Sequence, residues 1–245
     1  MDIKALPKKF YKRVNLSVKN QFSKYAKEYK NYNIIQQIVA KSLVRELKFQ
    51  PKRILELGCG SGQVYTHIFW DLDFYKAIDF SSSMCELHPK GENIEVKCFD
   101  FDTQEFLDEI KDNSYDIVLS SSALQWSKDL SKIIKHLSCI TNEINAVLFT
   151  SNTFKTIQEL TKTKSPILDE NSIKEAFSKY FKCEFETILY KLEFDNKKDL
   201  FDYIKKSGVS GEASLDFKDA KKLYKEYNLN YLEFEVIFVK TISKL

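Results

Sequence analysis

Three glycines at alternate positions follow a short apolar segment, and this run limits what the chain can form more than any other feature. The run Ile-Leu-Glu-Leu-Gly-Cys-Gly-Ser-Gly carries one acid, Glu56, and then Gly58, Gly60 and Gly62. An apolar strand that enters a glycine-rich bend lets backbone amides approach a ligand closely, and glycine supplies positive φ where the bend needs it. We expect a strand, a ligand-binding bend and a helix that begins at about Gln63.

A dinucleotide-binding turn, G-x-G-x-x-G, is the competing interpretation of this bend. Counted from Gly58 it needs glycine where the chain has Gln63, and counted from Gly60 it needs glycine where the chain has Tyr65. An acid followed by Gly-x-Gly-x-Gly after a strand instead resembles the first motif of the class I S-adenosylmethionine-dependent methyltransferases. The resemblance implies that Glu56 and the three glycines bind S-adenosyl-L-methionine as methyl donor.

Two further predicted strands end on acids, Asp79 and Asp100. An acid at the spacing of Asp79 accepts hydrogen bonds from both ribose hydroxyls in the dinucleotide-binding folds. The alternative is that both acids simply end strands in turns. The segment from Asp79 to Met84 resembles the family's Asp-x-Ser-x-x-Met, whose methionine lies against the adenine. In that family Asp100 and the amide of Phe101 would contact the adenine edge.

The rest of the chain alternates strand-like and helical patterns, which is typical of a mostly parallel sheet covered on both faces. We predict an α/β fold: a Rossmann-like, doubly wound, mostly parallel seven-stranded sheet of the class I methyltransferase type, with an N-terminal helical arm and a helical insertion after the fifth strand. The 245 residues fit one methyltransferase domain. Its predicted parts are a basic helical arm at 1–50, a cofactor-binding core at 51–150, and a helical substrate cover at 151–180 and 196–228.

Ligands bind outside the carboxyl ends of the strands in such sheets. We therefore expect Glu56, Asp79, Asp100 and Ser120 to gather at one edge of the sheet, with Ser120 among the cofactor contacts. The predicted strands after the first lie at 74–78, 94–99, 115–120, 146–150, 184–192 and 231–242.

Composition favours a cytoplasmic enzyme without a membrane segment or metal. The apolar runs are shorter than a bilayer span, and the lysine-rich start lacks the apolar region of a signal peptide. Five scattered cysteines include no C-x-x-C pair, and the three histidines have no metal-ligand spacing. We expect neither disulfides nor a metal site.

Charge is unevenly distributed along the chain. Residues 1–53 hold fourteen Lys or Arg against three acids, whereas the remainder holds 24 against 32. A basic arm of this kind suits an acidic partner, either nucleic acid or an acidic carrier protein. The alternative is a solubilising helix face.

Two segments resemble the malonyl-acyl-carrier-protein O-methyltransferases of biotin synthesis. Phe22, Ala26, Tyr29 and Gln36 have the spacing of that family's F-x-x-x-A-x-x-Y element and its later Gln. The segment 116–126 is similar to its fourth strand and Ala-Val/Leu-Gln-Trp loop, which trans-aconitate methyltransferases share in part. The chain departs from the family at Ser121, where Asn is common, and at 232–234, where Leu-Glu-Phe replaces a Thr-Tyr pair.

This resemblance implies methylation of the free carboxylate of malonyl-acyl carrier protein, the step that initiates biotin precursor synthesis. Tyr29 would close over the cofactor, and Tyr29, Gln125 and Trp126 would contact the substrate. A malonyl carboxylate, with a pKa near 4, is already ionised at neutral pH, so we expect no catalytic acid or base. Alignment of the reacting atoms would be the enzyme's main contribution.

Other functions remain open. The enzyme would alternatively methylate a different small carboxylic acid, such as one resembling trans-aconitate, or RNA. No Asn/Asp-Pro-Pro-Tyr motif follows the fourth strand, where the chain has Ser120-Ser121-Ser122, and this disfavours a nucleic acid substrate. A non-catalytic S-adenosylmethionine-binding scaffold is the alternative of a different class. No motif indicates the oligomeric state.

Overall fold

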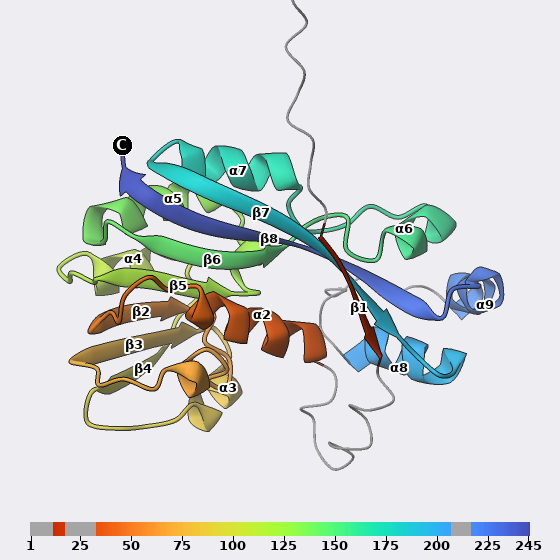
Figure 1. The fold of residues 1–245 in the computed structure, drawn as a ribbon, viewed down its shortest axis with the longest axis horizontal. Coiled ribbons are helices and arrows are strands. Elements are labelled where there is room, and N and C mark those ends of the chain that lie inside the picture. The colour runs from red at the N-terminus through yellow and green to blue at the C-terminus, as the bar shows by residue number, and fades with distance from the viewer. Residues whose placement is uncertain (1–11, 18–32, 207–216) are drawn as a thin grey trace, which may run out of the picture.

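One twisted sheet organises the molecule (Figure 1). The computed structural model describes residues 12–17, 33–206 and 217–245. The strands of these ranges are β1 Lys12–Ser17, β2 Arg53–Leu57, β3 Phe74–Asp79, β4 Ile94–Cys98, β5 Ile117–Ser121, β6 Ile144–Phe149, β7 Phe181–Glu193 and β8 Tyr231–Lys244. The α-helices are α2 Ile34–Arg45, α3 Ser82–Leu87, α4 Gln104–Ile110, α5 Leu130–Ile140, α6 Lys155–Thr161, α7 Glu170–Ser178, α8 Lys197–Lys206 and α9 Phe217–Glu226.

The strand order is β1-β7-β8-β6-β5-β2-β3-β4. All pairs are parallel except those of β8, which runs antiparallel to both β6 and β7. The sheet that the sequence predicts is therefore present as β2 to β8, and the predicted class I methyltransferase fold is confirmed. The central strands β6, β5, β2 and β3 run parallel to one another, so their carboxyl ends lie at one edge of the sheet.

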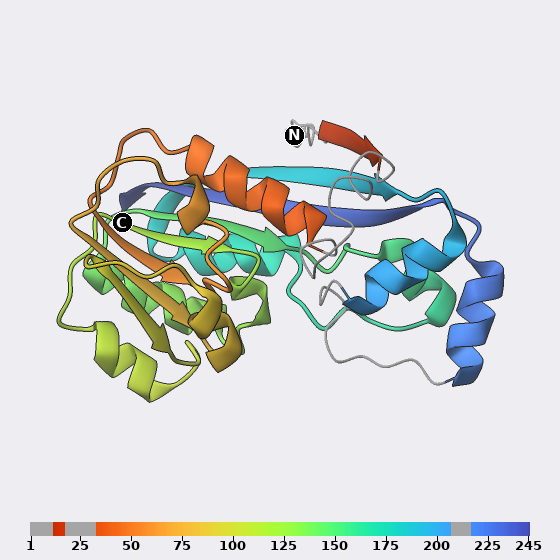
Figure 2. The same cartoon turned by 90° about the horizontal axis from the view of Figure 1, so that it is seen from below.

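Helices cover both faces of the sheet, as Figure 2 shows: α2 lies on one face, and α4, α5 and α7 lie on the other. Successive residues of β2 point to opposite faces, so Ile54 packs in the core on the α2 side and Leu55 in the core on the α5 side. Both side chains are fully buried. A central strand covered on both faces reads as a continuous apolar run, which is why β2 could be recognised from the sequence.

The prediction that the basic arm is helical is wrong for part of its length. Residues Ile34–Arg45 form α2, but Lys12–Ser17 form β1, which adds an eighth strand in parallel beside β7. The sequence Lys-Arg-Val-Asn-Leu-Ser alternates polar and apolar residues, and this period of two suits an edge strand.

The helix expected from Gln63 is also absent. A short 3-10 turn, η2 (Tyr65–His67), takes its place. The Thr66 hydroxyl donates a hydrogen bond to the Gln63 carbonyl at 2.8 Å. Such local side-chain bonds compete with helix propagation, and the β-branched and aromatic residues here are weak helix formers.

Three helices, α6, α8 and α9, lie beyond the carboxyl ends of β5 and β6 (Figures 1 and 2). The long strands β7 and β8 extend toward them and connect them to the main sheet. Buried side chains join the two parts, among them Tyr203 of α8 and Phe234 of β8, whose rings meet edge to face at 6.0 Å. Within the described residues, no helix combines the length and the apolar character needed to span a membrane.

Candidate functional site

The glycine bend turns sharply at the carboxyl end of β2. Gly58, Gly60 and Gly62 have φ values of 70°, 51° and 89°, so all three adopt the conformation that favours glycine. The amides of Gly58 and Cys59 both donate to the Ile78 carbonyl of β3, at 2.8 and 3.0 Å. The bend is therefore fastened to the neighbouring strand, and a Cβ added at Gly60 would meet no atom within 4 Å.

Asp79 fixes the geometry of this bend. Its Oδ2 accepts the Gly60 amide at 2.9 Å and its Oδ1 accepts the Ser81 amide at 2.9 Å. The side chain is 8% exposed. A carboxylate oxygen can accept more than one hydrogen bond, so both oxygens retain capacity for ligand hydroxyls.

The adenine side of the expected site contains a residue that the sequence analysis did not single out. Phe80, directly after Asp79, is 76% exposed, whereas Met84 in α3 is half-buried. An exposed aromatic ring beside a ribose-binding acid offers a flat apolar surface for a base. Its position immediately after a strand-ending acid was the signal in the sequence that could have identified it.

Asp100 lies at the neighbouring strand end. The Phe99 amide donates to the Asp79 carbonyl at 3.0 Å, which brings the ends of β3 and β4 together. Asp100 is exposed, and its Oδ1 accepts the Asp102 amide at 2.9 Å in a turn. Asp100 therefore forms the strand-ending turn that was the alternative interpretation of this acid. The side chain of Phe101 packs against the core.

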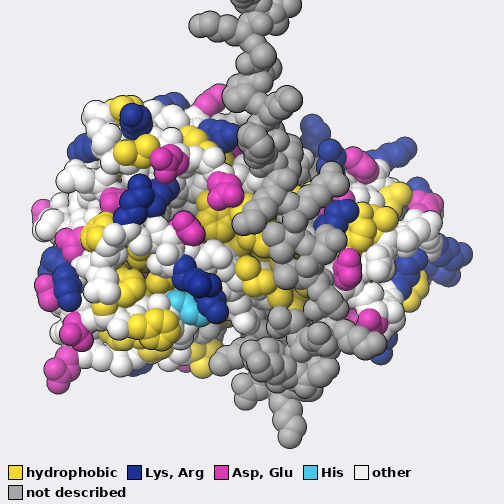
Figure 3. Space-filling model, viewed as in Figure 1, with side chains coloured by type: hydrophobic (Ala, Val, Ile, Leu, Met, Phe, Trp, Pro, Cys, Tyr) yellow, Lys and Arg dark blue, Asp and Glu magenta, His cyan; other side chains and the backbone are white. Residues whose placement is uncertain are grey.

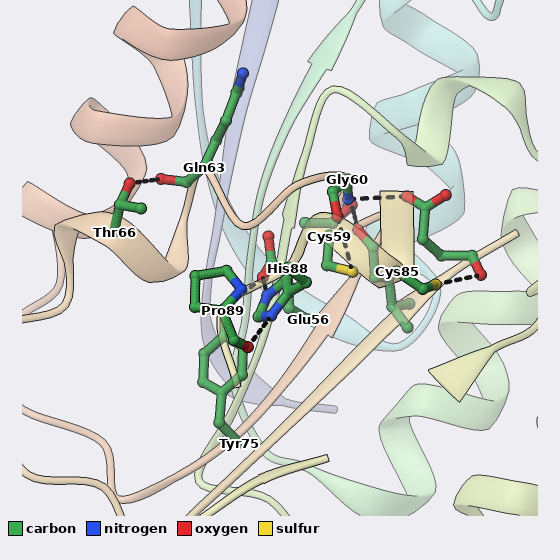
Figure 4. A network of polar contacts seen from close by, with 12 residues as sticks. Glu56, Cys59, Gly60, Gln63, Thr66, Tyr75, Cys85, His88 and Pro89 are labelled. Atoms are coloured by element: carbon green, nitrogen blue, oxygen red, sulfur yellow. Dashed lines mark hydrogen bonds and ion pairs between the residues drawn. The ribbon is translucent and has the colours of Figure 1, made fainter. Parts of the chain in front are cut away.

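Glu56 lies beside Tyr75 and His88 (Figure 4), and it does not reach the surface. It is 1% exposed and accepts a hydrogen bond from the Tyr75 hydroxyl, and His88 Nε2 lies 3.9 Å from its Oε2. Burial raises the pKa of Glu56 above its usual value, and the His88 and Tyr75 contacts oppose that shift. Burial likewise raises the pKa of the Cys59 thiol, with the charges of Glu56 and Asp79 adding to the effect.

His88 is a further residue that the sequence did not reveal. It is 2% exposed, follows α3, and its Nδ1 lies 2.8 Å from the Pro89 carbonyl oxygen. A Cβ added at Gly62 would lie 2.5 Å from Pro89 Cδ and 3.2 Å from His88 Cδ2. The segment after α3 therefore packs directly on the last glycine of the bend.

Ser120 is fully buried at the end of β5, and its hydroxyl donates to the Leu57 carbonyl at 2.9 Å. This hydrogen bond joins β5 to the end of β2, so the Ser120 side chain stabilises the sheet. Any contact of Ser120 with a cofactor would come from its backbone.

The loop after β5 contains buried polar groups. Gln125 is 3% exposed and donates from Nε2 to the Ser122 carbonyl at 2.8 Å, whereas Trp126 is 40% exposed. Across the part of the chain that the structure describes, the hydroxyls of Ser121 and Ser122 and Oε1 of Gln125 are buried without a hydrogen-bond partner. Ser122 also has a φ of 61°, which is strained for a residue with a side chain.

This loop and the glycine bend are in direct contact. A Cβ added at Gly58 would lie 2.0 Å from the Cβ of Ala123. The loops that follow β2 and β5 therefore lie side by side, as the prediction that the two strand ends gather at one edge requires.

The unusual residues at 232–234 hold the start of the helical insertion. Leu232 and Phe234 are fully buried, and Phe234 packs edge to face on Phe154 at 4.9 Å. Glu233 accepts the backbone amide of Thr156 at 3.0 Å and its hydroxyl at 2.7 Å. The segment therefore positions the connection from β6 to α6.

A second acid of β8 holds the same connection. Glu235 is 5% exposed and accepts the Thr150 hydroxyl at 2.6 Å and the Asn152 amide group at 2.8 Å. The carboxylates of Glu233 and Glu235 are thus both bound to neutral donors of the chain that follows β6.

Tyr29, together with Phe22 and Ala26 of the N-terminal element, lies outside the described residues. In the described ranges, no group of three or more His, Cys, Asp or Glu side chains is arranged to hold a metal ion.

Comparisons with known proteins agree with this geometry. Residues 55–142, from β2 through α5, match a family model described as a methyltransferase domain. The YcgJ protein from Bacillus subtilis superposes with a TM-score of 0.63 at 11% identity, covering 85% of this chain and 99% of that one. A protein from Bacillus halodurans described as a methyltransferase gives 0.60 at 10% identity, covering 82% and 96%.

The fold is that of a class I methyltransferase. The matched domain and this fold support S-adenosylmethionine as methyl donor. Among curated proteins, the malonyl-[acyl-carrier protein] O-methyltransferase of Bacillus cytotoxicus is 26% identical to this chain over 237 residues, which cover 85% of this chain and 81% of that protein.

Proposed function

We propose that this chain methylates the free carboxylate of a malonyl thioester carried by an acyl carrier protein, using S-adenosylmethionine. The observation that carries the proposal is the set of buried polar groups without partners in the loop after β5, which packs on the glycine bend. The similarity to a malonyl-[acyl-carrier protein] O-methyltransferase over most of both chains supports the substrate class.

The residues of the bend fit the cofactor. Gly60 leaves open space, Asp79 retains acceptor capacity for the ribose hydroxyls, and the exposed ring of Phe80 would cover the adenine from one side together with Met84. Asp100 and the amide of Phe101 would complete the adenine contacts. When bound, the cofactor supplies an electrophilic methyl group.

The loop after β5 fits a carboxylate acceptor. Two serine hydroxyls that lack a partner in the described chain, those of Ser121 and Ser122, are donors, and hydrogen bonds to a carboxylate are about twice as strong as those between neutral groups. The strained backbone of Ser122 is the kind of outlier that occurs where a residue is held for function. Gln125 and the half-exposed Trp126 would form the neighbouring wall.

In this proposal the neutral hydroxyls of Ser121 and Ser122 orient the substrate carboxylate. Arg53 lies at the opposite edge of the sheet, where its Nε donates to the Ser114 carbonyl at 3.1 Å. Lys205 and Lys206 are the last residues of α8, and their side chains lie outside the part of the chain that the structure describes.

The chain needs no proton acceptor for this reaction. The malonyl carboxylate is ionised at neutral pH, so the protein must align its oxygen with the methyl group and remove water from the reacting pair. Glu56 is separated from the surface and accepts a hydrogen bond from the Tyr75 hydroxyl.

Methylation would have a simple physical purpose. Enzymes of fatty acid synthesis hold acyl chains in apolar sites, where a free carboxylate is costly to bury. A methyl ester removes that charge and allows the malonyl group to act as a primer. In this proposal the product enters the synthesis of a biotin precursor.

The test is transfer of labelled methyl from S-adenosylmethionine to malonyl-acyl carrier protein, with trans-aconitate and total RNA assayed in parallel. The proposal predicts label on the malonyl carrier that base releases as volatile methanol, as it does from a methyl ester. Label only on trans-aconitate or RNA would replace the substrate, and cofactor binding without transfer to any of them would indicate a scaffold.

A further inference from the structure

Exposed lysines gather on two helices beyond the carboxyl edge of the sheet. Helix α6 follows β6, α9 precedes the antiparallel strand β8, and the two helices pack against each other. Both therefore lie on the side of the sheet where the glycine bend and the loop after β5 meet. The exposed lysines of α6, of the turn that follows it and of α9, here called the α6–α9 lysine surface, are Lys155, Lys162, Lys164, Lys221, Lys222 and Lys225.

The geometry of α9 separates its lysines from its packing face. At 3.6 residues per turn, Lys221, Lys222 and Lys225 fall within a sector of about 100°. Leu223 points the other way and is 4% exposed. Lys197 of α8 is not part of this surface, because it contacts α9. Its Nζ donates to the Tyr224 carbonyl at 2.6 Å and lies 5.3 Å from the centre of the Tyr224 ring.

Charge is segregated between this part of the molecule and the main sheet. Residues 51–150 hold nine Lys or Arg against sixteen acids. The three helical segments 155–164, 197–206 and 217–226 hold eleven lysines against five acids. Figure 3 shows dark blue side chains at the end of the molecule formed by these helices.

The six lysines make no ion pair with any residue in the described ranges. Exposed lysines that lack an internal partner remain available for an acidic surface, and clustered charge accelerates the encounter with such a partner. A docking surface next to the carboxyl edge of the sheet would also place the carrier so that its thioester points toward the loop after β5.

We propose that the α6–α9 lysine surface docks the acidic acyl carrier protein that presents the substrate. The inference rests on the proposed function, because it needs a carrier-bound substrate. A single-stranded nucleic acid is the competing acidic partner, and the experiment below includes it.

The test uses the full chain with a triple variant, Lys221→Glu, Lys222→Glu and Lys225→Glu. The control triple is Lys111→Glu, Lys132→Glu and Lys135→Glu, three exposed lysines of the main domain. Methyl transfer is measured with malonyl-acyl carrier protein and with the malonyl thioester of N-acetylcysteamine, which lacks the protein. Binding of a fluorescent RNA oligonucleotide is measured in the same buffer.

The proposal predicts that the α9 triple raises the KM for malonyl-acyl carrier protein by about tenfold, while the control triple does not. Transfer to the small thioester would be unchanged in both. An unchanged KM, or equal losses with both substrates, overturns the docking surface. Loss of RNA binding without a KM change assigns the surface to nucleic acid, and failure to methylate either thioester overturns the proposed function together with the docking proposal.

Discussion

Gly58 and Ala123 leave no room between them: a Cβ on Gly58 would lie 2.0 Å from the Cβ of Ala123. This contact joins the glycine bend after β2 to the loop after β5, which we propose as the acceptor site. The relative position of the two loops therefore depends on one missing methyl group.

The contact predicts a difference between two glycines. Gly60→Ala introduces only the cost of a positive φ, about 1–2 kcal/mol of unfolding free energy, because its Cβ position is open. Gly58→Ala adds the clash with Ala123 and should cost more, with loss of cofactor binding. Urea unfolding measures both variants.

A second substitution tests the cause. Ala123→Gly in the Gly58→Ala background removes the clashing Cβ, so the double variant should return close to the stability of Gly60→Ala. A double variant as unstable as Gly58→Ala would show that the contact is not responsible.

The sequence was sufficient for the parts of this site that are local. The three positive-φ glycines, the acid that ends β3, the acid that follows β4, and seven of the strands follow from periodicity and spacing. The contact of Gly58 with Ala123 and the packing of His88 on the bend join segments far apart in the sequence, and no local pattern encodes them.

The errors have physical causes of the same kind. The 3-10 turn at Tyr65–His67 reflects competition from a side-chain hydrogen bond of Thr66. Strand β1 exists because β7 offers an edge, which the sequence of the arm alone does not report.

Asp79 gives a direct test of the cofactor site. Asp79→Ala removes the acceptor for the ribose and releases the Gly60 amide, and we expect weaker binding of S-adenosylhomocysteine by about 2–3 kcal/mol, roughly 30–150-fold. Asp79→Asn keeps one oxygen and should lie between. Calorimetry measures both, with the exposed Asp112→Ala as control; equal affinities for all four proteins would refute the assignment.

Ser121 and Ser122 are predicted to matter for the substrate and not for the fold. Each Ser→Ala change should raise the KM for the malonyl substrate about tenfold, because a hydrogen bond to a charged group contributes about 1.5 kcal/mol. The unfolding free energy should change little, since neither hydroxyl has a partner in the described chain. Steady-state kinetics measure both variants, with Ser114→Ala as control. Equal KM values for the malonyl substrate in all three variants would contradict the prediction.

Glu56 should make stability depend on pH. Its raised pKa means that the native carboxyl keeps its proton above pH 4.5, where the unfolded one has lost it. In that window the native state binds more protons, so the free energy of unfolding falls as pH rises. Glu56→Gln keeps an acceptor for the Tyr75 hydroxyl and removes this dependence.

The wild type should therefore lose stability relative to Glu56→Gln by about 1.4 kcal/mol per pH unit within the window. Urea unfolding of both proteins at a series of pH values from 4.5 upward measures it. A difference that is constant with pH, or that grows in favour of the wild type, would contradict the effect of burial. Glu105→Gln, an exposed site in α4, is the control.

The central claim is that a carboxylate receives the methyl group, and intact-mass spectrometry of the carrier tests it most directly. Malonyl-acyl carrier protein and acetyl-acyl carrier protein, which lacks the carboxylate, are incubated separately with enzyme and S-adenosylmethionine. The account predicts a mass gain of one methyl group, less the proton it replaces, on the malonyl carrier alone. No gain on the malonyl carrier, or the same gain on both, would contradict carboxyl methylation.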